Sequence, residues 1–371
     1  MKVIIAAAGT GGHINPGIAI ANKIMQEAPG SEVIFIGTTR GLENDLVPKS
    51  GFKLKTINAY GIPRKISVEN IHRFISTVKS VKEAEDIIDQ FRPDVVIGTG
   101  GYITLAVGKA AIKRKIPLIM HESNAFPGMS IKLLEKKASK VLVGFEDTKL
   151  RLRNKENVVV TGTPTNVKER TIPDEEKMAI KLSLGMKPDM PLVLVFGGSQ
   201  GAKSINEAFA NIVSKKENKE YQIYWAAGRD QYDEVKNYLK HHKLDIENVK
   251  NAKILPYIYN MNDVMNACDL VVCRSGAMTI TEVSILGKPA IFIPYPYATE
   301  NHQEYNARVL ESRGAAKIIL DKDLNGNILN RNIMSIITSK EKLNEMSKIA
   351  KDTAIKNVEN KIYEQIKNVI K

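Results

Sequence analysis

Short β-branched runs alternate with longer helix-like segments along this chain, and that alternation constrains the fold more than any other feature. Parallel neighbouring strands need a crossover connection, usually a helix, so the alternation is typical of βαβ units. The expected strands are Lys2–Ala8, Glu32–Gly37, Lys53–Asn58, Asp94–Gly98, Leu118–Glu122, Lys140–Gly144 and Val158–Gly162, then Leu192–Phe196, Gln222–Ala226, Ala252–Pro256, Leu270–Arg274, Ala290–Pro294 and Ala316–Leu320. The sequence therefore predicts an α/β protein with doubly wound parallel sheets.

The length of the chain predicts two domains. Its 371 residues exceed the roughly 250–300 at which one hydrophobic core stops growing. A predicted strand ends in a Gly-Thr-Pro turn at residues 162–164, which suits a boundary. We expect one domain over 1–162 and a second over 163–344. Apolar residues at helical spacing predict a C-terminal helix over about 345–371 that packs back on the first domain.

Three glycine-rich turns, Gly9–His13, Gly98–Tyr102 and Gly197–Ala202, each follow a predicted strand and precede a predicted helix. Glycine permits positive φ and close approach of a ligand, while the helix directs unpaired N–H groups and its positive dipole end at an anion. A tight turn that needs only small residues would also use glycine, but it does not require the inserted Ser199-Gln200. Three such turns indicate two phosphorylated ligands, a donor and an acceptor.

A dinucleotide-binding domain is disfavoured by the details of the first turn. That fingerprint requires G-x-G-x-x-G and an acidic residue at the end of the second strand. Here Ile14 stands at the last glycine position, and the second strand ends in Ile36-Gly37-Thr38-Thr39 without a carboxylate.

His13, at the end of the first turn, is the candidate general base. Its ordinary pKa of about 6.5 leaves the imidazole mostly neutral at pH 7 and able to accept a proton. Alternatively, it orders the loop or donates a hydrogen bond to a phosphate.

In the second half, Ser199 can hold a phosphate oxygen at a helix start. Glu282 lies in a predicted helix over Ala277–Leu286, beside Ile280 and Val283. It is either a solvated residue or a buried carboxylate suited to the two vicinal hydroxyls of a ribose. Gln303 can read sugar hydroxyls through its amide donor and acceptor.

The formal net charge of +13 is concentrated in the first half, where residues 1–161 carry 24 Lys and Arg against 15 Asp and Glu. No nucleic-acid-binding motif accompanies this charge, so no nucleic-acid partner is expected. Residues 60–82 interleave apolar and basic residues, which suits either a core-packed helix or shallow insertion into an anionic membrane surface. No transmembrane segment is expected, and Cys268 and Cys273 without metal-ligand spacing suit a reducing cytoplasm.

Neither a metal nor a cofactor is expected. The Asp321-Lys322-Asp323 string is the one acidic pair that suggests a divalent ion, and it lies far in sequence from every glycine turn. We interpret it as a solvated loop, because helix ends and amide groups suffice to stabilise a departing diphosphate.

Five segments together resemble the MurG family of bacterial glycosyltransferases. They are Ala7–His13, Gly98–Tyr102, His121–Gly128, Gly197–Ala202 and Cys273–Glu282, in order and spacing over nearly the whole chain. The resemblance implies a GT-B fold, in which two Rossmann-like domains face each other across a cleft. It also implies inverting transfer of N-acetylglucosamine from UDP-N-acetylglucosamine to the C4 hydroxyl of undecaprenyl-pyrophosphoryl-MurNAc-pentapeptide (lipid I), which gives lipid II for peptidoglycan at the cytoplasmic face of the membrane.

The resemblance also assigns roles to individual positions. On the donor side these are Thr10, Gly11, Gly12, Asn124, Ser199, Ile258, Ala277, Met278, Thr279, Ile280, Thr281, Glu282 and Gln303. On the acceptor-pyrophosphate side they are His13, Gly100, Gly101 and Tyr102. Three positions depart from the family pattern: Ala8 replaces a frequent glycine, Ser123 a common glutamine, and Asn166 an arginine that helps to hold the donor.

Three other functions remain open at this point, the first of which is that of another lipid glycosyltransferase with the GT-B fold. A UDP-N-acetylglucosamine 2-epimerase would use a similar scaffold on a soluble substrate, and a non-catalytic lipid-diphosphate binder would keep only the first-half turns.

Overall fold

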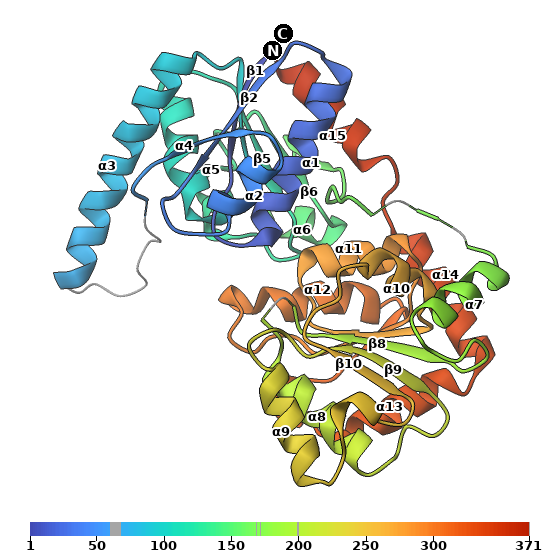
Figure 1. Ribbon diagram of the computed structural model, residues 1–371. Coiled ribbons are helices and arrows are strands. Elements are labelled where there is room, and N and C mark those ends of the chain that lie inside the picture. The colour runs from blue at the N-terminus through green and yellow to red at the C-terminus, as the bar shows by residue number, and fades with distance from the viewer. Residues whose placement is uncertain (60–67, 168, 171, 199, 371) are drawn as a thin grey trace. The chain divides into compact units, whose positions relative to one another are not determined.

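The computed structural model describes residues 1–59, 68–167, 169–170, 172–198 and 200–370, and within 68–78 the backbone only. The chain divides into two compact units (Figure 1). The N-terminal unit comprises Met1–Asn166 and Ile355–Lys371, and the C-terminal unit comprises Val167–Ala354.

In the N-terminal unit, seven parallel strands of the described residues form one sheet in the order β3-β2-β1-β4-β5-β6-β7. The strands are β1 Lys2–Ala6, β2 Glu32–Gly37, β3 Lys53–Thr56, β4 Val95–Gly98, β5 Leu118–Glu122, β6 Lys140–Val143 and β7 Val158–Val160. The helices are α1 Gly11–Glu27, α2 Glu43–Lys49, α3 Val68–Phe91, α4 Gly101–Lys113, α5 Met129–Leu134, α6 Glu146–Arg151 and α15 Val358–Val369.

In the C-terminal unit, the described residues form a six-stranded parallel sheet in the order β10-β9-β8-β11-β12-β13. Its strands are β8 Leu192–Phe196, β9 Gln222–Ala226, β10 Ala252–Leu255, β11 Leu270–Cys273, β12 Ala290–Phe292 and β13 Ala316–Ile318. Its α-helices are α7 Asp174–Ser183, α8 Lys203–Ser214, α9 Tyr232–His241, α10 Met261–Ala267, α11 Ala277–Ile285, α12 His302–Glu311, α13 Gly326–Ile337 and α14 Lys340–Thr353. Three 3-10 turns are η1 Ile246–Asn248, η2 Thr299–Asn301 and η3 Asp321–Asp323.

The predicted fold class is confirmed, and each expected strand is present with ends that differ by at most two residues. The sheet of the N-terminal unit is covered on both faces, as parallel sheets generally are. Val3 and Ile5 of β1 pack into one core with residues of α1 and α15, whereas Ile4 and Ala6 pack into a second core with residues of α4. This two-sided burial explains why the strands are continuous apolar runs in the sequence.

Both sheets reverse strand order at one point, between β1 and β4 in the N-terminal unit and between β8 and β11 in the C-terminal unit. Loops that follow neighbouring strands diverge at such a switch point, and ligands of open α/β sheets bind there. The three glycine turns follow β1, β4 and β8. The topology therefore places every glycine turn at a switch point.

The C-terminal tail is two helices where the sequence predicts one. The chain breaks after α14 at residues 354–357, where Asn357 adopts a positive φ of 57°. The first helix, α14, belongs to the C-terminal unit, whereas α15 lies against α1 in the N-terminal unit (Figure 1). Val358, Ile362 and Ile366 are the buried residues of α15.

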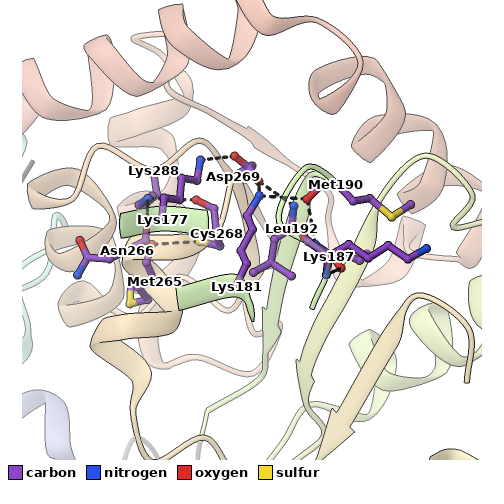
Figure 2. Close-up of polar contacts among 11 residues, drawn as sticks. Lys177, Lys181, Lys187, Met190, Leu192, Met265, Asn266, Cys268, Asp269 and Lys288 are labelled. Atoms are coloured by element: carbon purple, nitrogen blue, oxygen red, sulfur yellow. Dashed lines mark hydrogen bonds and ion pairs between the residues drawn. The ribbon is translucent and has the colours of Figure 1, made fainter. Parts of the chain in front are cut away.

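A partly buried ion-pair cluster anchors α7 at the amino end of the C-terminal sheet (Figure 2). Asp269 pairs with Lys177 and with Lys181, whose Nζ lies 2.9 Å from Asp269 Oδ2. The same carboxylate accepts the Leu192 N–H at 2.7 Å, at the start of β8. Burial raises the pKa of Asp269, but the two lysines and these hydrogen bonds outweigh burial and hold the pKa below its usual value.

Candidate active site

The β1–α1 turn places His13 at the beginning of a helix. The Thr10 carbonyl oxygen accepts from the N–H groups of His13 at 3.0 Å and Ile14 at 3.2 Å. Gly11 and Gly12 are the first residues of α1, so their N–H groups precede the first intrahelical bonds and point out of the helix end. The turn therefore brings amide donors and an imidazole together at the carboxyl end of β1.

The β4–α4 turn makes room for the His13 ring. Gly100 and Gly101 have φ values of 122° and 76°. A Cβ at Gly100 would lie 2.4 Å from His13 Cδ2 and 2.9 Å from Nε2, and one at Gly101 would lie 3.4 Å from Nδ1. Thr99 Oγ1 donates to the His13 carbonyl oxygen at 2.7 Å. Gly100 is therefore needed in part because a side chain there would clash with the imidazole of His13, a reason that the sequence does not reveal.

The hydrogen bond of His13 selects its tautomer. Nδ1 lies 3.3 Å from the Ala8 carbonyl oxygen, and a carbonyl only accepts, so the proton must reside on Nδ1. In the neutral ring Nε2 then carries the lone pair. Burial lowers the pKa of His13, and the bond to Ala8 offsets only part of that effect. The ring is thus a neutral imidazole with Nε2 as its basic atom.

A carboxylate that the sequence analysis did not identify lies behind this turn. Glu43, in the first turn of α2, is 0% exposed. Its Oε2 accepts the Gly9 N–H at 2.9 Å, and its Oε1 accepts the N–H and the hydroxyl of Thr38 at 2.9 and 2.6 Å. Burial raises the pKa of Glu43, but these bonds bring it below its usual value. The end of β2 does therefore meet a carboxylate, supplied by the next helix, and backbone and hydroxyl donors of the chain itself satisfy it.

The β5–α5 loop is organised around Glu122. Its Oε1 accepts from the backbone N–H of Asn124 at 2.9 Å and from the Asn124 side-chain NH2 at 3.0 Å, and its Oε2 accepts the Gly128 N–H at 2.8 Å. The side-chain amide of Asn124, predicted to face the donor sugar, is thereby held in one orientation.

Tyr102, the second residue of α4 and a predicted acceptor residue, is half-buried.

The β8–α8 turn in the C-terminal unit packs tightly against the end of β9. A Cβ at Gly201 would lie 2.2 Å from the Ala227 carbonyl oxygen, and one at Gly228 would lie 2.3 Å from Gly201 N. Small residues are thus required on both sides of this contact. Ser199, the predicted phosphate ligand, lies outside the described residues.

The β11–α11 turn is held by α12 through Gln303. The Gln303 Oε1 accepts the N–H groups of Ser275 at 3.3 Å and Tyr295 at 3.0 Å, and Ser275 Oγ donates to the Gln303 carbonyl oxygen at 2.8 Å. Both lone pairs of the side-chain carbonyl are therefore engaged. The expectation that Gln303 reads sugar hydroxyls through donor and acceptor narrows to its NH2 donor.

The remaining predicted donor residues differ in burial. Ile258, Ala277 and Ile280 are buried, so any contact they make with a nucleotide would use the backbone, while Met278, Thr279, Thr281 and Glu282 are half-buried. Glu282 is therefore neither the fully solvated residue nor the buried carboxylate between which the sequence left the choice open.

The interpretation of Asp321 as part of a solvated loop is wrong. Asp321 Oδ1 accepts from Ser204 Oγ at 2.7 Å and pairs with Arg274, whose guanidinium also donates to the Ile293 and Pro294 carbonyl oxygens at 3.1 Å. These partners follow β8, β11 and β12, so the parallel sheet brings together residues that are distant in sequence. The interpretation was wrong because residues far apart in sequence can lie close together at the edge of a parallel sheet.

Among the described residues, His, Cys, Asp and Glu side chains form no group of three or more that could hold a metal ion. Within the same part of the chain, no helix combines the length and apolar character needed to cross a membrane.

Two family models match the chain. The glycosyltransferase family 28 N-terminal domain matches residues 3–143, and the family 28 C-terminal domain matches residues 192–362. The chain belongs to glycosyltransferase family 28. The first match contains the turns after β1 and β4, and the second contains those after β8 and β11.

Relatives of this family 28 member match over its whole length. A UDP-N-acetylglucosamine–N-acetylmuramyl-(pentapeptide) pyrophosphoryl-undecaprenol N-acetylglucosamine transferase from Acetivibrio thermocellus is 42% identical over 372 residues, covering 100% of this chain and 99% of the relative. The transferase of the same name from Ruminiclostridium cellulolyticum is 41% identical over 370 residues, covering 100% of both chains. The resemblance inferred from five motifs is confirmed.

Solved structures agree on the fold. The crystal structure of Acinetobacter baumannii MurG aligns with a TM-score of 0.78 at 28% identity over 99% of both chains. The UDP-GlcNAc 2-epimerase from Neisseria meningitidis aligns with a TM-score of 0.67 at 17% identity, over 99% of this chain and 100% of the epimerase. The second likeness shows the fold alone.

Proposed function

We propose that this protein is an inverting glycosyltransferase that moves N-acetylglucosamine from UDP-N-acetylglucosamine to the C4 hydroxyl of lipid I, which gives lipid II for peptidoglycan. The observation that carries this conclusion is the 42% identity with a transferase of that activity over the complete chain. The 2-epimerase alternative has only the shared fold in its favour, at 17% identity.

We assign the chemistry at the acceptor to the N-terminal unit. In-line attack by a sugar hydroxyl requires a base within hydrogen-bond reach of its proton. His13 suits this role because its Nδ1 is committed to the Ala8 carbonyl and Nε2 is left as the basic atom. Gly100, Gly101 and Tyr102 border the same site, and the N–H groups of the two helix ends suit the acceptor pyrophosphate.

We assign the nucleotide to the C-terminal unit. The turns after β8 and β11 precede α8 and α11, whose amino ends favour a diphosphate and stabilise the charge that develops on departing UDP. Ser199, Ile258 and the segment Ala277–Glu282 would then contact the nucleotide, and the NH2 of Gln303 would donate to a sugar hydroxyl. No step in this mechanism calls for a metal ion.

We also propose that the N-terminal unit docks peripherally on an anionic membrane surface at the cytoplasmic face. The segment that supports this proposal is residues 60–82. The structure does not describe the side chains of residues 60–78, whereas Lys79 and Lys82 are exposed. Each basic residue near such a surface contributes about 1 kcal/mol to the free energy of binding. The triple substitution Lys65→Glu, Arg73→Glu and Lys79→Glu should therefore weaken vesicle binding at least ~100-fold. Unchanged cosedimentation with phosphatidylglycerol vesicles would contradict the proposal.

The activity is tested by measuring UDP release from UDP-N-acetylglucosamine with and without a lipid I analogue. A transferase releases UDP only when the acceptor is present, and a disaccharide product forms in equal amount. An epimerase isomerises the donor or releases UDP without acceptor, and a lipid-diphosphate binder releases none. Either of those results would refute the proposed function.

A further inference from the structure

Glu43 and His13 contact opposite ends of the same peptide group. Oε2 of Glu43 accepts the Gly9 N–H at 2.9 Å, and the carbonyl of that peptide, which belongs to Ala8, lies 3.3 Å from His13 Nδ1. The three groups form a continuous chain of hydrogen bonds, from carboxylate to peptide to imidazole. We propose that Glu43 is a positioning residue that acts on His13 through the Ala8–Gly9 peptide.

The physical basis is polarisation of the shared peptide. A carboxylate that accepts an amide proton draws that proton toward itself and increases the negative charge on the carbonyl oxygen of the same group. The Ala8 oxygen then becomes a stronger acceptor for Nδ1–H of His13. This fixes the tautomer that leaves Nε2 basic and stabilises the imidazolium that forms when His13 takes a proton. In a serine-protease triad the carboxylate contacts the histidine directly, whereas here one peptide intervenes.

The surroundings keep this chain of hydrogen bonds isolated and ordered. Glu43 is wholly buried, and Gly37 and Gly41 leave the space that it fills, since a Cβ at either would lie 2.7 or 2.4 Å from its side chain. The His13 ring meets the uncharged Gly100 and Gly101 from the β4–α4 turn. The causes that shift the pKa of His13 are burial and its bond to the Ala8 carbonyl. The hydrogen-bonded route from Glu43 to the His13 ring runs through the Ala8–Gly9 peptide.

A purely structural role for Glu43, tying α2 to the ends of β1 and β2, predicts different behaviour. It would lower stability when removed but leave the titration of His13 unchanged. Thr38→Val supplies the matched control, because it removes the 2.6 Å hydroxyl bond to Oε1 while the carboxylate stays on the Gly9 N–H. Both variants disturb the same buried carboxylate, and only Glu43→Gln removes its charge.

The test combines nitrogen NMR of histidine-labelled protein with steady-state kinetics, and the His13 signal is assigned by its loss in His13→Ala. In Glu43→Gln we expect the His13 pKa to fall, the Nδ1–H tautomer to become less populated, and kcat to drop about 10-fold to 100-fold with little change in the KM for UDP-N-acetylglucosamine. Thr38→Val should keep the His13 pKa and stay within about threefold of the parent kcat. In a His13→Ala background, Glu43→Gln should cause no further loss.

An unchanged His13 pKa and tautomer in folded Glu43→Gln would overturn the proposal, as would an equal loss of kcat in the His13→Ala background. The rate measurements rest on the proposed function of His13, but the NMR measurement does not. A shifted His13 pKa with an unchanged kcat would support the coupling and refute the role of His13 as base. If Glu43→Gln does not fold, Glu43→Asp carries the test, because the withdrawn charge should still lower the His13 pKa.

Discussion

Replacement of Gly100 by alanine tests how the two glycine turns of the N-terminal unit depend on each other. Gly100 has φ 122° and ψ 179°, a region essentially restricted to glycine. The backbone strain alone should lower the free energy of unfolding by about 1–3 kcal/mol. The new Cβ would also lie 2.4 Å from His13 Cδ2, too close for any real contact, so the ring must move.

The displacement of His13 gives a kinetic effect that strain alone does not. General-base catalysis accelerates a reaction about 10²–10⁴-fold, so displacement of the His13 ring should lower kcat at least ~100-fold. Acceptor-dependent UDP release measures kcat, and thermal unfolding measures stability. Gly30→Ala is the matched control, because Gly30 has φ 86° and a Cβ there meets no atom within 4 Å. It should lose a similar amount of stability and keep its kcat.

One result would refute this reasoning. If Gly100→Ala is folded and turns over within about threefold of the parent, then either His13 tolerates displacement or it is not the base. Equal kinetic losses in Gly100→Ala and Gly30→Ala would show that general destabilisation, and not the position of the imidazole, controls the rate.

Two further predictions concern the C-terminal unit. Asp269→Asn leaves the buried Lys181 and the half-buried Lys177 without their carboxylate (Figure 2), and should lower the free energy of unfolding at pH 7 by about 2–3 kcal/mol in urea titrations. The folded pKa of Asp269 is depressed, so the stability that the Asp269 ion pairs contribute is present above its unfolded pKa of about 3.9 and is lost as pH falls through the folded pKa. Parallel curves of stability against pH for parent and variant below about pH 5 would contradict this prediction. Gln303→Ala removes the acceptor of two backbone N–H groups and the predicted sugar donor, and should raise the KM for UDP-N-acetylglucosamine about tenfold. An unchanged KM would exclude Gln303 from the donor site.

Much of the fold could be predicted from local sequence because strand and helix periodicities are local properties. Buried parallel strands are continuous apolar runs, and each expected strand was found within two residues of its predicted ends. The glycine turns were equally visible, since positive φ at Gly9, Gly100 and Gly201 leaves few alternatives to glycine. The break between α14 and α15 was missed because apolar spacing continues through it.

The partners of the site residues could not be predicted, because they depend on which strand ends lie side by side. Glu43 lies 34 residues from the Gly9 N–H that it binds, and Asp321 lies 47 residues from Arg274. No periodicity in the sequence encodes those pairings.

The sequence by itself determined the strands, the glycine turns and the family. Only the tertiary structure decided that Gly100 makes room for His13, and that the side-chain carbonyl oxygen of Gln303 accepts backbone N–H groups. It also decided that a buried carboxylate, that of Glu43, accepts the Gly9 N–H in the first turn. The physical reason is that secondary structure follows from interactions between near neighbours in the chain. The charge and orientation of a site residue instead follow from whatever the strand order brings to the same edge of the sheet.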